Sequence, residues 1–373
     1  MMKSSFQLGR VLDIPIGVNY TWFIIFALIT VSLAMVHFPE NYPFWPDQTY
    51  WLAGLVASLL FFGSVVAHEL AHSVVAISSG IPVKSITLFV FGGVAQITRE
   101  ASKPRTELVM SLAGPLSSLL LAGLFFVISL ATLYLSQPMS AIADWLASVN
   151  LVLALFNLIP GFPLDGGRVL RSIVWWATDN HRLASRVASL MGQGVSYLFI
   201  IVGVFTMFRG EWLNGLWLAF IGWFLDNAAG ESYRQVVLQD AVRGYTARDL
   251  MTRDCPTVDS NRSLSELVHD YILPAGRRCF LVTDNDQLTG IVTLHNIKAV
   301  PRDQWGETPV SRVMTPVERL KSVKPTDEVL TILQRMDEED VNQMPVVEDG
   351  VVVGMIGRDS LLHFLRTRSD LGI

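Results

Sequence analysis

Charged residues are scarce in this chain of 373 residues, and cysteine is almost absent. Only 16% of the residues are Asp, Glu, Lys or Arg, whereas a soluble globular domain usually has about 25%. The shortage is uneven, because residues 11–230 contain nearly all the long apolar runs and residues 231–373 resemble an ordinary soluble segment. The composition therefore predicts a membrane-embedded part followed by a soluble part.

Three further features that the sequence lacks narrow the range of possible functions. The net charge is only -5 and no basic block occurs, so nucleic acid is not an expected partner. Cys255 and Cys279 lack a CxxC spacing, which argues against a disulfide framework or a thiolate zinc site and favours reduced thiols in a cytosolic domain. The N-terminus has no short apolar segment followed by a small-residue cleavage site, so we expect no removable signal peptide.

Long apolar runs predict a polytopic helical membrane domain, because a membrane-spanning helix needs about 20 mostly apolar residues. Connections with several Lys and Arg residues alternate along the chain with connections that have none or, in the last case, only Arg209. The positive-inside tendency then predicts a multi-pass cell-membrane protein with both termini and the soluble part in the cytoplasm. Six runs are long enough to span: residues 16–37, 51–79, 106–136, 141–160, 185–208 and 212–230.

A shorter segment, Ile81–Thr98, is too interrupted to span a membrane. Its β-branched and aromatic residues around Gly92 and Gly93 predict two strands joined by a turn. Such strands must be buried in protein or line a cavity, because backbone groups at membrane depth find no water. An exposed edge strand here would accept an extended peptide, which makes Gly92 and Gly93 candidate substrate contacts.

The strongest chemical signal lies in the second apolar run, as His68-Glu69-Leu70-Ala71-His72. Residues four apart share one face of a helix, so both imidazoles can bind one zinc ion with Glu69 beside it. A catalytic zinc site keeps one position open for water, and Glu69 would accept the proton of that water as general base. The alternative is a coincidental polar turn, but three ionisable residues in so apolar a segment are costly unless functional.

Two histidines leave one protein ligand to find, and Asp165 is the best candidate. It lies in the run NLIPGFPLDGG, residues 157–167, where two prolines end a membrane helix and two glycines follow. Such a break is tolerated at membrane depth only around a cavity or a buried site. A helix-capping role for Asp165 is the alternative. Asn157 is equally a candidate substrate contact or an amide that satisfies a helix end.

The third apolar run contains the small residues Ser111, Gly114, Pro115 and Ser118. Small residues on a membrane helix most often allow close packing against a neighbouring helix, which is the role that we expect for these four.

The membrane part resembles the site-2 protease family of intramembrane metalloproteases. The resemblance rests on HELAH and NLIPGFPLDGG, with further similarity in FGGVA at Phe91–Ala95 and AGPLSS at Ala113–Ser118. It covers about residues 1–230, and Ser118 is one departure, since many members have Asn after the Gly-Pro pair.

The resemblance implies a zinc metalloendopeptidase, with one catalytic Zn2+ held by His68, His72 and Asp165 and with Glu69 as catalytic base. The implied substrate is the transmembrane segment of another membrane protein, hydrolysed within the lipid bilayer in regulated intramembrane proteolysis.

Two similar units follow residue 245, with Met251 and Met314 at equivalent positions 63 residues apart. Each unit predicts a short helix ending in Met-Thr, a strand, a helix, a strand–turn–strand and a final helix, which is a small α/β unit in tandem. The units resemble cystathionine β-synthase (CBS) repeats. The predicted fold is therefore a polytopic α-helical membrane domain with a small membrane-associated β element, plus a cytosolic α/β tandem CBS domain. The expected boundaries are 1–230 for the protease domain, 231–245 for a linker, and 246–303 and 308–369 for the repeats.

CBS pairs in many proteins bind adenine nucleotides, so ATP or another adenine nucleotide is an implied cofactor and regulator. The usual signature is Gly, two apolar residues, Ser or Thr, and an Asp three residues further on. The first repeat has Gly290, Thr293 and Asn296, with Asn in place of Asp, and the second, Gly354–Ser360, lacks both polar residues. Thr293 and Asn296 are the candidate nucleotide contacts. The alternative is a purely structural role, or a homodimer formed through the repeats.

Two other functions fit parts of the sequence. A CBS-regulated channel or transporter would also join membrane spans to a CBS tail, but the polar residues match zinc ligation rather than a ring around a pore. An inactive relative would bind a membrane protein without cutting it, and the intact HExxH motif together with Asp165 argues against this role.

Overall fold

The structure is a computed structural model, and it forms two compact units, Met1–Val237 and Leu238–Ile373. Cys255, Thr98 at the end of the expected strands, and the end of the second repeat from residue 365 lie outside the described residues. The described residues are 6–90, 92–97, 101–242, 244–253, 256–275, 279–284, 287–339, 341–349, 351–358, 360–361 and 364.

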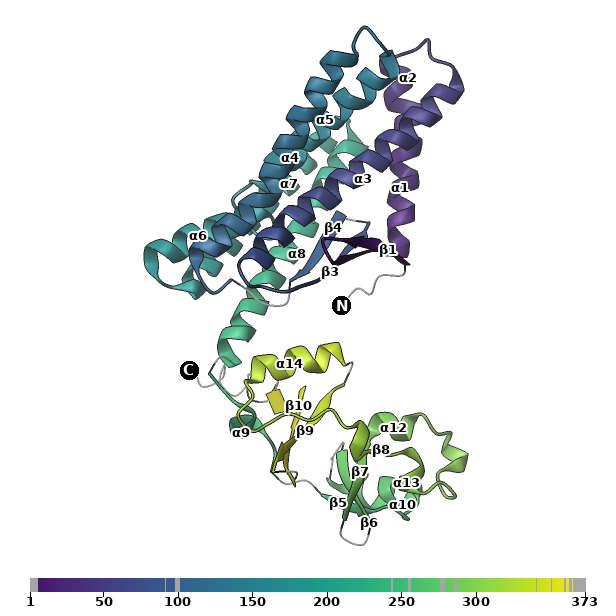
Figure 1. The fold of residues 1–373 in the computed structure, drawn as a ribbon, viewed down its shortest axis with the longest axis vertical. Helices are drawn as coiled ribbons and strands as arrows, with labels where there is room; N and C mark the ends of the chain where they lie inside the picture. The colour runs from purple at the N-terminus through teal and green to yellow at the C-terminus, as the bar shows by residue number, and fades with distance from the viewer. Residues whose placement is uncertain are drawn as a thin grey trace. The chain divides into compact units, whose positions relative to one another are not determined.

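The first unit is built on long apolar helices (Figure 1). In the described part of the chain, five helical stretches have the length and hydropathy to cross a membrane. The first of these combines three consecutive helical pieces. The helices are α1 Tyr20–Ser32, the π-helical turn η1 Leu33–His37, α2 Phe38–Asn41, α3 Asp47–Ser78, α4 Pro104–Thr132, α5 Gln137–Asn157, α6 Asp165–Thr178, α7 His181–Phe208 and α8 Trp212–Val242.

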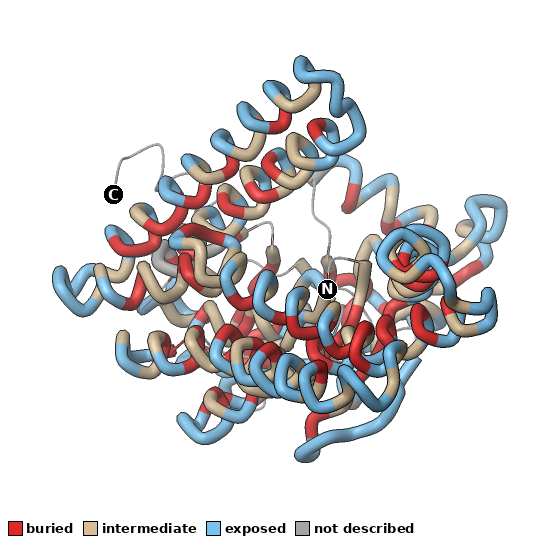
Figure 2. The backbone as a smooth tube through the Cα atoms, turned by 90° about the horizontal axis from the view of Figure 1, so that it is seen from above, coloured by how far each residue is buried: buried red, intermediate tan, exposed pale blue. Residues whose placement is uncertain are grey.

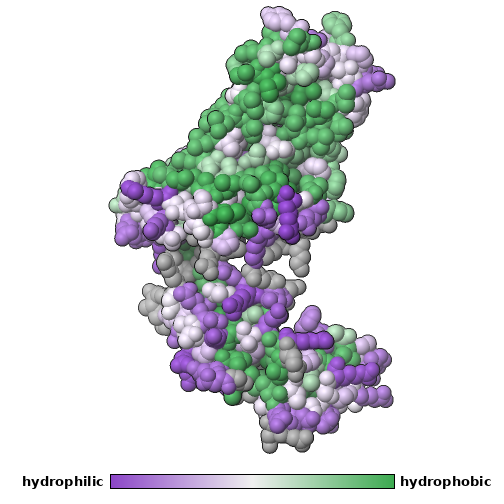
Figure 3. All heavy atoms as spheres, viewed as in Figure 1, coloured by the Kyte–Doolittle hydropathy of each residue, from purple (hydrophilic) through white to green (hydrophobic). Residues whose placement is uncertain are grey.

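The outer surface of these helices is apolar, as expected for helices that lie in lipid. Large hydrophobic side chains are widely exposed on them, such as Leu120 on α4 and Ile201 on α7. On the face shown in Figure 3, apolar residues form a continuous band over the long helices, and hydrophilic residues gather at its ends. Buried and exposed positions alternate around each helix (Figure 2), and the buried ones include many Ala, Gly and Ser residues that let helices approach closely.

The predicted sixth span, residues 212–230, lies within α8, but it is not among the five stretches that meet the length and hydropathy requirement. Asn214, Asp226 and Asn227 lower the hydropathy of this stretch. Five helical stretches suited to crossing a membrane are thus present in the described residues, and the count of six spans stays a prediction. α8 continues to Val242, so the residues expected to form a linker include its last turns.

A four-stranded sheet accompanies the helices, in the order β1-β2-β3-β4. The two strands expected within Ile81–Thr98 are present as β3 Val83–Phe89 and β4 Gly92–Ile97, paired antiparallel. The other two strands, β1 Phe6–Val11 and β2 Ile14–Val18, were not predicted; β2 joins β3 in parallel.

The start of the first span was therefore placed too early in the sequence. Ile14–Val18 is a buried strand, and α1 begins only after Asn19, whose side chain accepts a hydrogen bond from the Thr21 backbone N–H. A hydropathy window cannot separate a short buried strand from the helix that follows it, because both are apolar. Val18 and Leu88 of the sheet pack against Phe62 and Val65 of α3.

Gly80 ends α3 and directs the chain into the sheet. It has a left-handed backbone with φ +78°, which an L side chain rarely adopts. The N–H groups of Gly80 and Ile81 donate to the carbonyls of Ile77 and Ala76, which is a Schellman termination. The following strands then return along α3, and this return brings β4 beside Glu69.

The second unit has the tandem α/β architecture expected for two CBS repeats. The N-terminal helix of each repeat completes the core of the other, because Ala247 packs with Ile332 and Ile356, whereas Val310 packs with Phe280 and Val292. The first repeat contains α9 Ala247–Leu250, β5 Thr257–Asp259, α10 Leu264–Glu266, η2 Leu267–Ile272, α11 Leu273–Ala275, β6 Cys279–Asp284, β7 Gln287–Thr293 and α12 Leu294–Lys298. After η3 Arg302–Gln304, the second contains α13 Val310–Val313, β8 Thr315–Pro316, η4 Val317–Arg319, α14 Val329–Glu338, β9 Gln343–Glu348 and β10 Val351–Gly357.

Candidate active site

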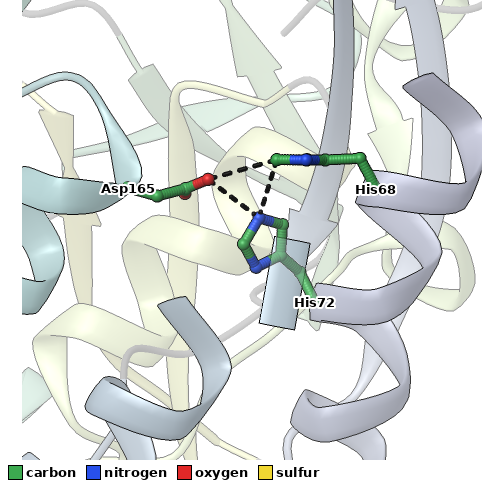
Figure 4. A group of neighbouring side chains, drawn as sticks. All are labelled: His68, His72 and Asp165. Atoms are coloured by element: carbon green, nitrogen blue, oxygen red, sulfur yellow. Dashed lines mark hydrogen bonds and ion pairs between the residues drawn. The ribbon is translucent and has the colours of Figure 1, made fainter. Parts of the chain in front are cut away.

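Three potential metal ligands converge between α3 and α6 (Figure 4). The Nε2 atoms of His68 and His72 lie 3.2 Å apart, and each is 3.1 Å from Oδ2 of Asp165. Both histidines are 5% exposed, so these groups meet in a largely water-excluded place. The structure thus brings together all three residues that the sequence nominated as ligands.

Partners on α4 hold the far nitrogen of each imidazole. Nδ1 of His72 donates a hydrogen bond to the Met110 carbonyl oxygen at 2.6 Å, and Nδ1 of His68 lies 2.9 Å from the hydroxyl of Ser118. A carbonyl can only accept, so Nδ1 of His72 carries a proton, and in its neutral form the ring presents an Nε2 lone pair. Outer hydrogen bonds of this kind orient metal-binding histidines.

The donor arrangement fits a single metal ion. In the neutral form of His72, its Nε2 lone pair faces a carboxylate oxygen of Asp165, and a metal ion bound to both atoms would satisfy these two acceptors. Tetrahedral zinc with bonds of about 2.0–2.1 Å separates its ligands by about 3.3 Å, close to the 3.1–3.2 Å between these donors. The His2Asp set leaves a fourth position for water or substrate.

Gly114 on α4 gives a second indication of the ion. A Cβ atom at this position would lie 2.2 Å from Nε2 of His72 and 2.5 Å from Nε2 of His68. The helix backbone therefore approaches the two donor atoms so closely that no other residue fits. Pro115 follows and removes an N–H from the helix ladder beside the site.

Asp165 is held by a loop that packs backbone against backbone. It lies in the first turn of α6, where Leu164 rather than Asp165 occupies the N-cap position. A Cβ on Gly161 would be 2.5 Å from the Gly192 Cα, and one on Gly167 would be 2.4 Å from the Gly161 carbonyl carbon. The glycines of NLIPGFPLDGG thus let the loop press against α7 and against itself, which fixes where the carboxylate lies.

The carboxylate of Glu69 lies beside β4. Its Oε2 accepts a hydrogen bond from the Ala95 backbone N–H at 3.1 Å. A Cβ on Gly93 would lie 2.7 Å from Cγ of Glu69, so Gly93 permits this close approach. Gly92 has φ +126° at the start of the strand, and a Cβ there would meet open space.

The remaining candidate residues have local partners. The amide of Asn157 donates to the Leu153 carbonyl oxygen one turn earlier in α5, at 3.0 Å. In the second unit, Oδ1 of Asn296 accepts from the hydroxyl and the backbone N–H of Thr293, at 2.6 and 3.0 Å. Thr293 and Asn296 thereby form a capping box that opens α12.

Comparisons with known proteins identify relatives of both parts of the chain. A family description for peptidase family M50 matches residues 56–144 and 133–203, and one for the CBS domain matches 247–302 and 310–367. A candidate zinc metalloprotease from Synechocystis is 36% identical over 371 residues, which cover 98% of this chain and 97% of the relative.

This chain belongs to peptidase family M50. The candidate zinc metalloprotease Rip3 from Mycobacterium tuberculosis is 33% identical over 359 residues, which cover 95% of this chain and 91% of the relative. The solved site-2 protease from Methanocaldococcus jannaschii is 28% identical, with a TM-score of 0.44, over 61% of this chain and 95% of the other.

Family M50 membership decides between the functions that the sequence left open. The chain is a metalloprotease of the site-2 protease type with membrane-spanning helices and a tandem CBS pair, and its donor set suits zinc. A channel or transporter function is therefore not supported. A membrane-embedded M50 peptidase acts in a lipid environment on membrane proteins.

Sequence reasoning missed how α4 serves this M50 site. Gly114 and Ser118 were expected to allow helix packing, yet Gly114 makes room at the donor atoms and Ser118 contacts His68. Two signals in the sequence concern them: their spacing of four places them on one helix face, and both lie in the segment AGPLSS that resembles the protease family. Met110 acts through its backbone carbonyl, which side-chain identity does not reveal.

Proposed function

We propose that this chain hydrolyses peptide bonds within transmembrane segments of membrane proteins, as the cutting step of regulated intramembrane proteolysis. His68, His72 and Asp165 bind one Zn2+, and Glu69 is the general base. The observation that supports this most strongly is the convergence of three donors, two of them buried histidines on a helix long and apolar enough to cross a membrane.

Zinc, when bound, supplies Lewis-acid polarisation of the scissile carbonyl and of the attacking water. Glu69 accepts the proton of that water as the water oxygen bonds to the scissile carbonyl carbon, and it then delivers this proton to the amine nitrogen as the carbon–nitrogen bond breaks. Met110 and Ser118 keep the imidazoles of His72 and His68 turned toward the site.

The substrate must be extended where it is cut, because a helix hides its carbonyl groups in its own hydrogen bonds. β4 lies at one edge of the sheet, and an extended substrate segment would pair with it beside Glu69. Gly92 and Gly93 would contact this segment through their backbones, and Asn157 is a further proposed substrate contact. The Ala95 N–H now bound by Glu69 would become available to the substrate when Glu69 turns to the water.

Replacing Asp165 with Ala tests the ligand set. We expect the zinc affinity of Asp165→Ala to fall by more than about a hundredfold. Loss of a residue that only hydrogen-bonds to a metal ligand already lowers metal affinity by about 10- to 100-fold. Cleavage of a transmembrane peptide should be lost together with the metal. Zinc content by mass spectrometry and peptide cleavage would be measured on the detergent-purified full chain.

Asp144→Ala is the matched control, because this carboxylate is exposed on α5. It should retain zinc and cleavage. A folded wild-type chain without zinc and without cleavage would contradict the proposed site.

The CBS pair is proposed to lie in the cytoplasm, with both chain termini, and to regulate the protease through ATP or another adenine nucleotide. Thr293 and Asn296 are the proposed contacts, and nucleotide binding would have to share or replace their capping hydrogen bonds. A homodimer through the repeats is a further proposed arrangement.

Calorimetric titration of the full chain with ATP tests this regulation. We expect binding that weakens about tenfold in Asn296→Ala, which is the effect of about one lost hydrogen bond. Asn261→Ala, on an exposed turn, should leave binding unchanged. Absence of ATP binding to the wild type would favour a structural role, and sedimentation would then show whether the repeats dimerise.

A further inference from the structure

A buried ion pair lies outside the proposed ligand set, and the proposed reaction does not use it. Glu107 in the first turn of α4 is 1% exposed, and Arg171 in the middle of α6 is 5% exposed. Nε of Arg171 donates to Oε1 of Glu107 at 2.6 Å, and a terminal guanidinium nitrogen donates to the same oxygen. Charges are rarely buried so fully, so this pair calls for an explanation.

Glu107 belongs to the helix face that supports the histidines. The positions 107, 110, 114 and 118 are three or four residues apart, so they lie along one side of α4. Met110 accepts from His72, Gly114 makes room at both Nε2 atoms, and Ser118 contacts His68. The ion pair therefore connects α6 to the face of α4 that sets the orientation of both rings.

Arg171 belongs to the element that carries Asp165. Its guanidinium lies 5.2 Å from the ring centre of Phe162, in the loop before α6. The backbone N–H of Phe162 donates to the Ala188 carbonyl of α7 at 3.1 Å. Arg171 thus contacts the loop that positions Asp165 while its charge is bound to α4.

Stability alone does not explain such a pair. Burying two charges removes them from water, and apolar residues of similar volume are often as stable in their place. What an apolar pair cannot supply is a directional contact that fixes one helix against another. Here the two helices carry, respectively, the ring supports and the third ligand.

We propose that Glu107 and Arg171 are positioning residues that fix Asp165 relative to His68 and His72 and so set the affinity and geometry of the metal site. This inference rests on the ligand set of the proposed function. It concerns the contacts that position the ligands, so it can be wrong while the ligand set itself is correct.

The decisive variant combines Glu107→Leu with Arg171→Met. It removes both charges together, because either change alone breaks the buried pair while it leaves one of the two charges in place, which endangers folding. Arg168, whose Nε lies 4.0 Å from Oε1 of Glu107, keeps access to water because its side chain is 27% exposed. The full chain would be purified in detergent, stripped with a chelator, and titrated with Zn2+ and separately with Co2+.

We expect the double variant to unfold at the parental temperature but to bind zinc about tenfold more weakly, as for loss of an outer support of a metal ligand. The visible absorption of its Co2+ form should differ from that of the parent, because the position of the carboxylate changes. A purely structural role would leave this spectrum unchanged. Glu348→Leu with Arg248→Met removes an exposed ion pair in the second unit and should change neither measurement.

Parental zinc affinity with a parental Co2+ spectrum in the double variant would overturn the proposal. Failure of the double variant to fold would also overturn it, because the pair would then serve stability. If the unmodified chain itself binds no zinc, the proposed ligand set fails instead, and this result is distinct from the other two.

Discussion

The Glu69→Gln variant should retain its zinc, but its rate of peptide-bond hydrolysis should fall by about 10²- to 10⁴-fold, which is the usual contribution of a general base. Gln has the same shape as Glu, and its amide oxygen can still accept the Ala95 N–H that Glu69 accepts at 3.1 Å. The fold, the β4 contact and the ligands His68 and His72 therefore remain. Only the ability to take a proton from the attacking water is removed.

This result would be measured as zinc per chain and as the rate of cleavage of a transmembrane peptide in detergent. Glu40→Gln makes the same chemical change at an exposed position on α2 and should leave both values unchanged. Cleavage at the wild-type rate by a zinc-loaded Glu69→Gln chain would show that another group accepts the proton. Loss of both zinc and cleavage would instead give Glu69 a role in holding the metal site.

Gly114→Ala should remove the metal, although it adds only one methyl group. That methyl carbon would lie 2.2 Å from Nε2 of His72 and 2.5 Å from Nε2 of His68, which are the atoms proposed to bind zinc. The rings or α4 must then move, and the Nδ1 contacts to Met110 and Ser118 come from the same helix. We expect zinc affinity to fall by about a hundredfold or more, the upper range for disturbed ligand support.

Gly123→Ala is the matched control on the same helix, because a Cβ there meets nothing within 4 Å. Replacing a helical Gly with Ala normally stabilises a helix by about 1 kcal/mol, so this control should bind zinc normally and unfold no earlier than wild type. Zinc titration of the chelator-stripped proteins would compare the two variants. Equal zinc affinities would contradict the close approach of α4 to the donor atoms.

Much of the site could be predicted from sequence because its chemistry depends on local patterns. His68 and His72 are one helical turn apart, so the helix itself brings them to one face. Asp165 could be nominated because a carboxylate beside two prolines and two glycines is unusual in a membrane segment. Its contact with both histidines across 97 and 93 residues needed the structure.

Other features of the structure are not indicated by any pattern of neighbouring residues in the sequence. The last three residues of the strand Ile14–Val18 were assigned to a helix because its apolar residues continue into α1. The pairing of this strand with β3 joins segments about 70 residues apart in sequence. The carbonyl of Met110 is a backbone group that every residue has. In the sequence, Glu107 and Arg171 each look like an ordinary solvated charge beside an apolar segment until their burial in one pair is seen.

The sequence by itself determined the class of this protein and nominated the donors of its proposed metal site. Apolar length predicts membrane helices, HExxH predicts a metal-binding helix face, and the tandem repeat predicts the CBS pair, since each of these depends on residues close together in the chain. Only the tertiary structure decided that α4 supports both imidazoles, that β4 meets Glu69, and that an ion pair joins α4 to α6. These contacts depend on the distances between helices and strands, which are set by the packing of the whole membrane unit rather than by any one segment.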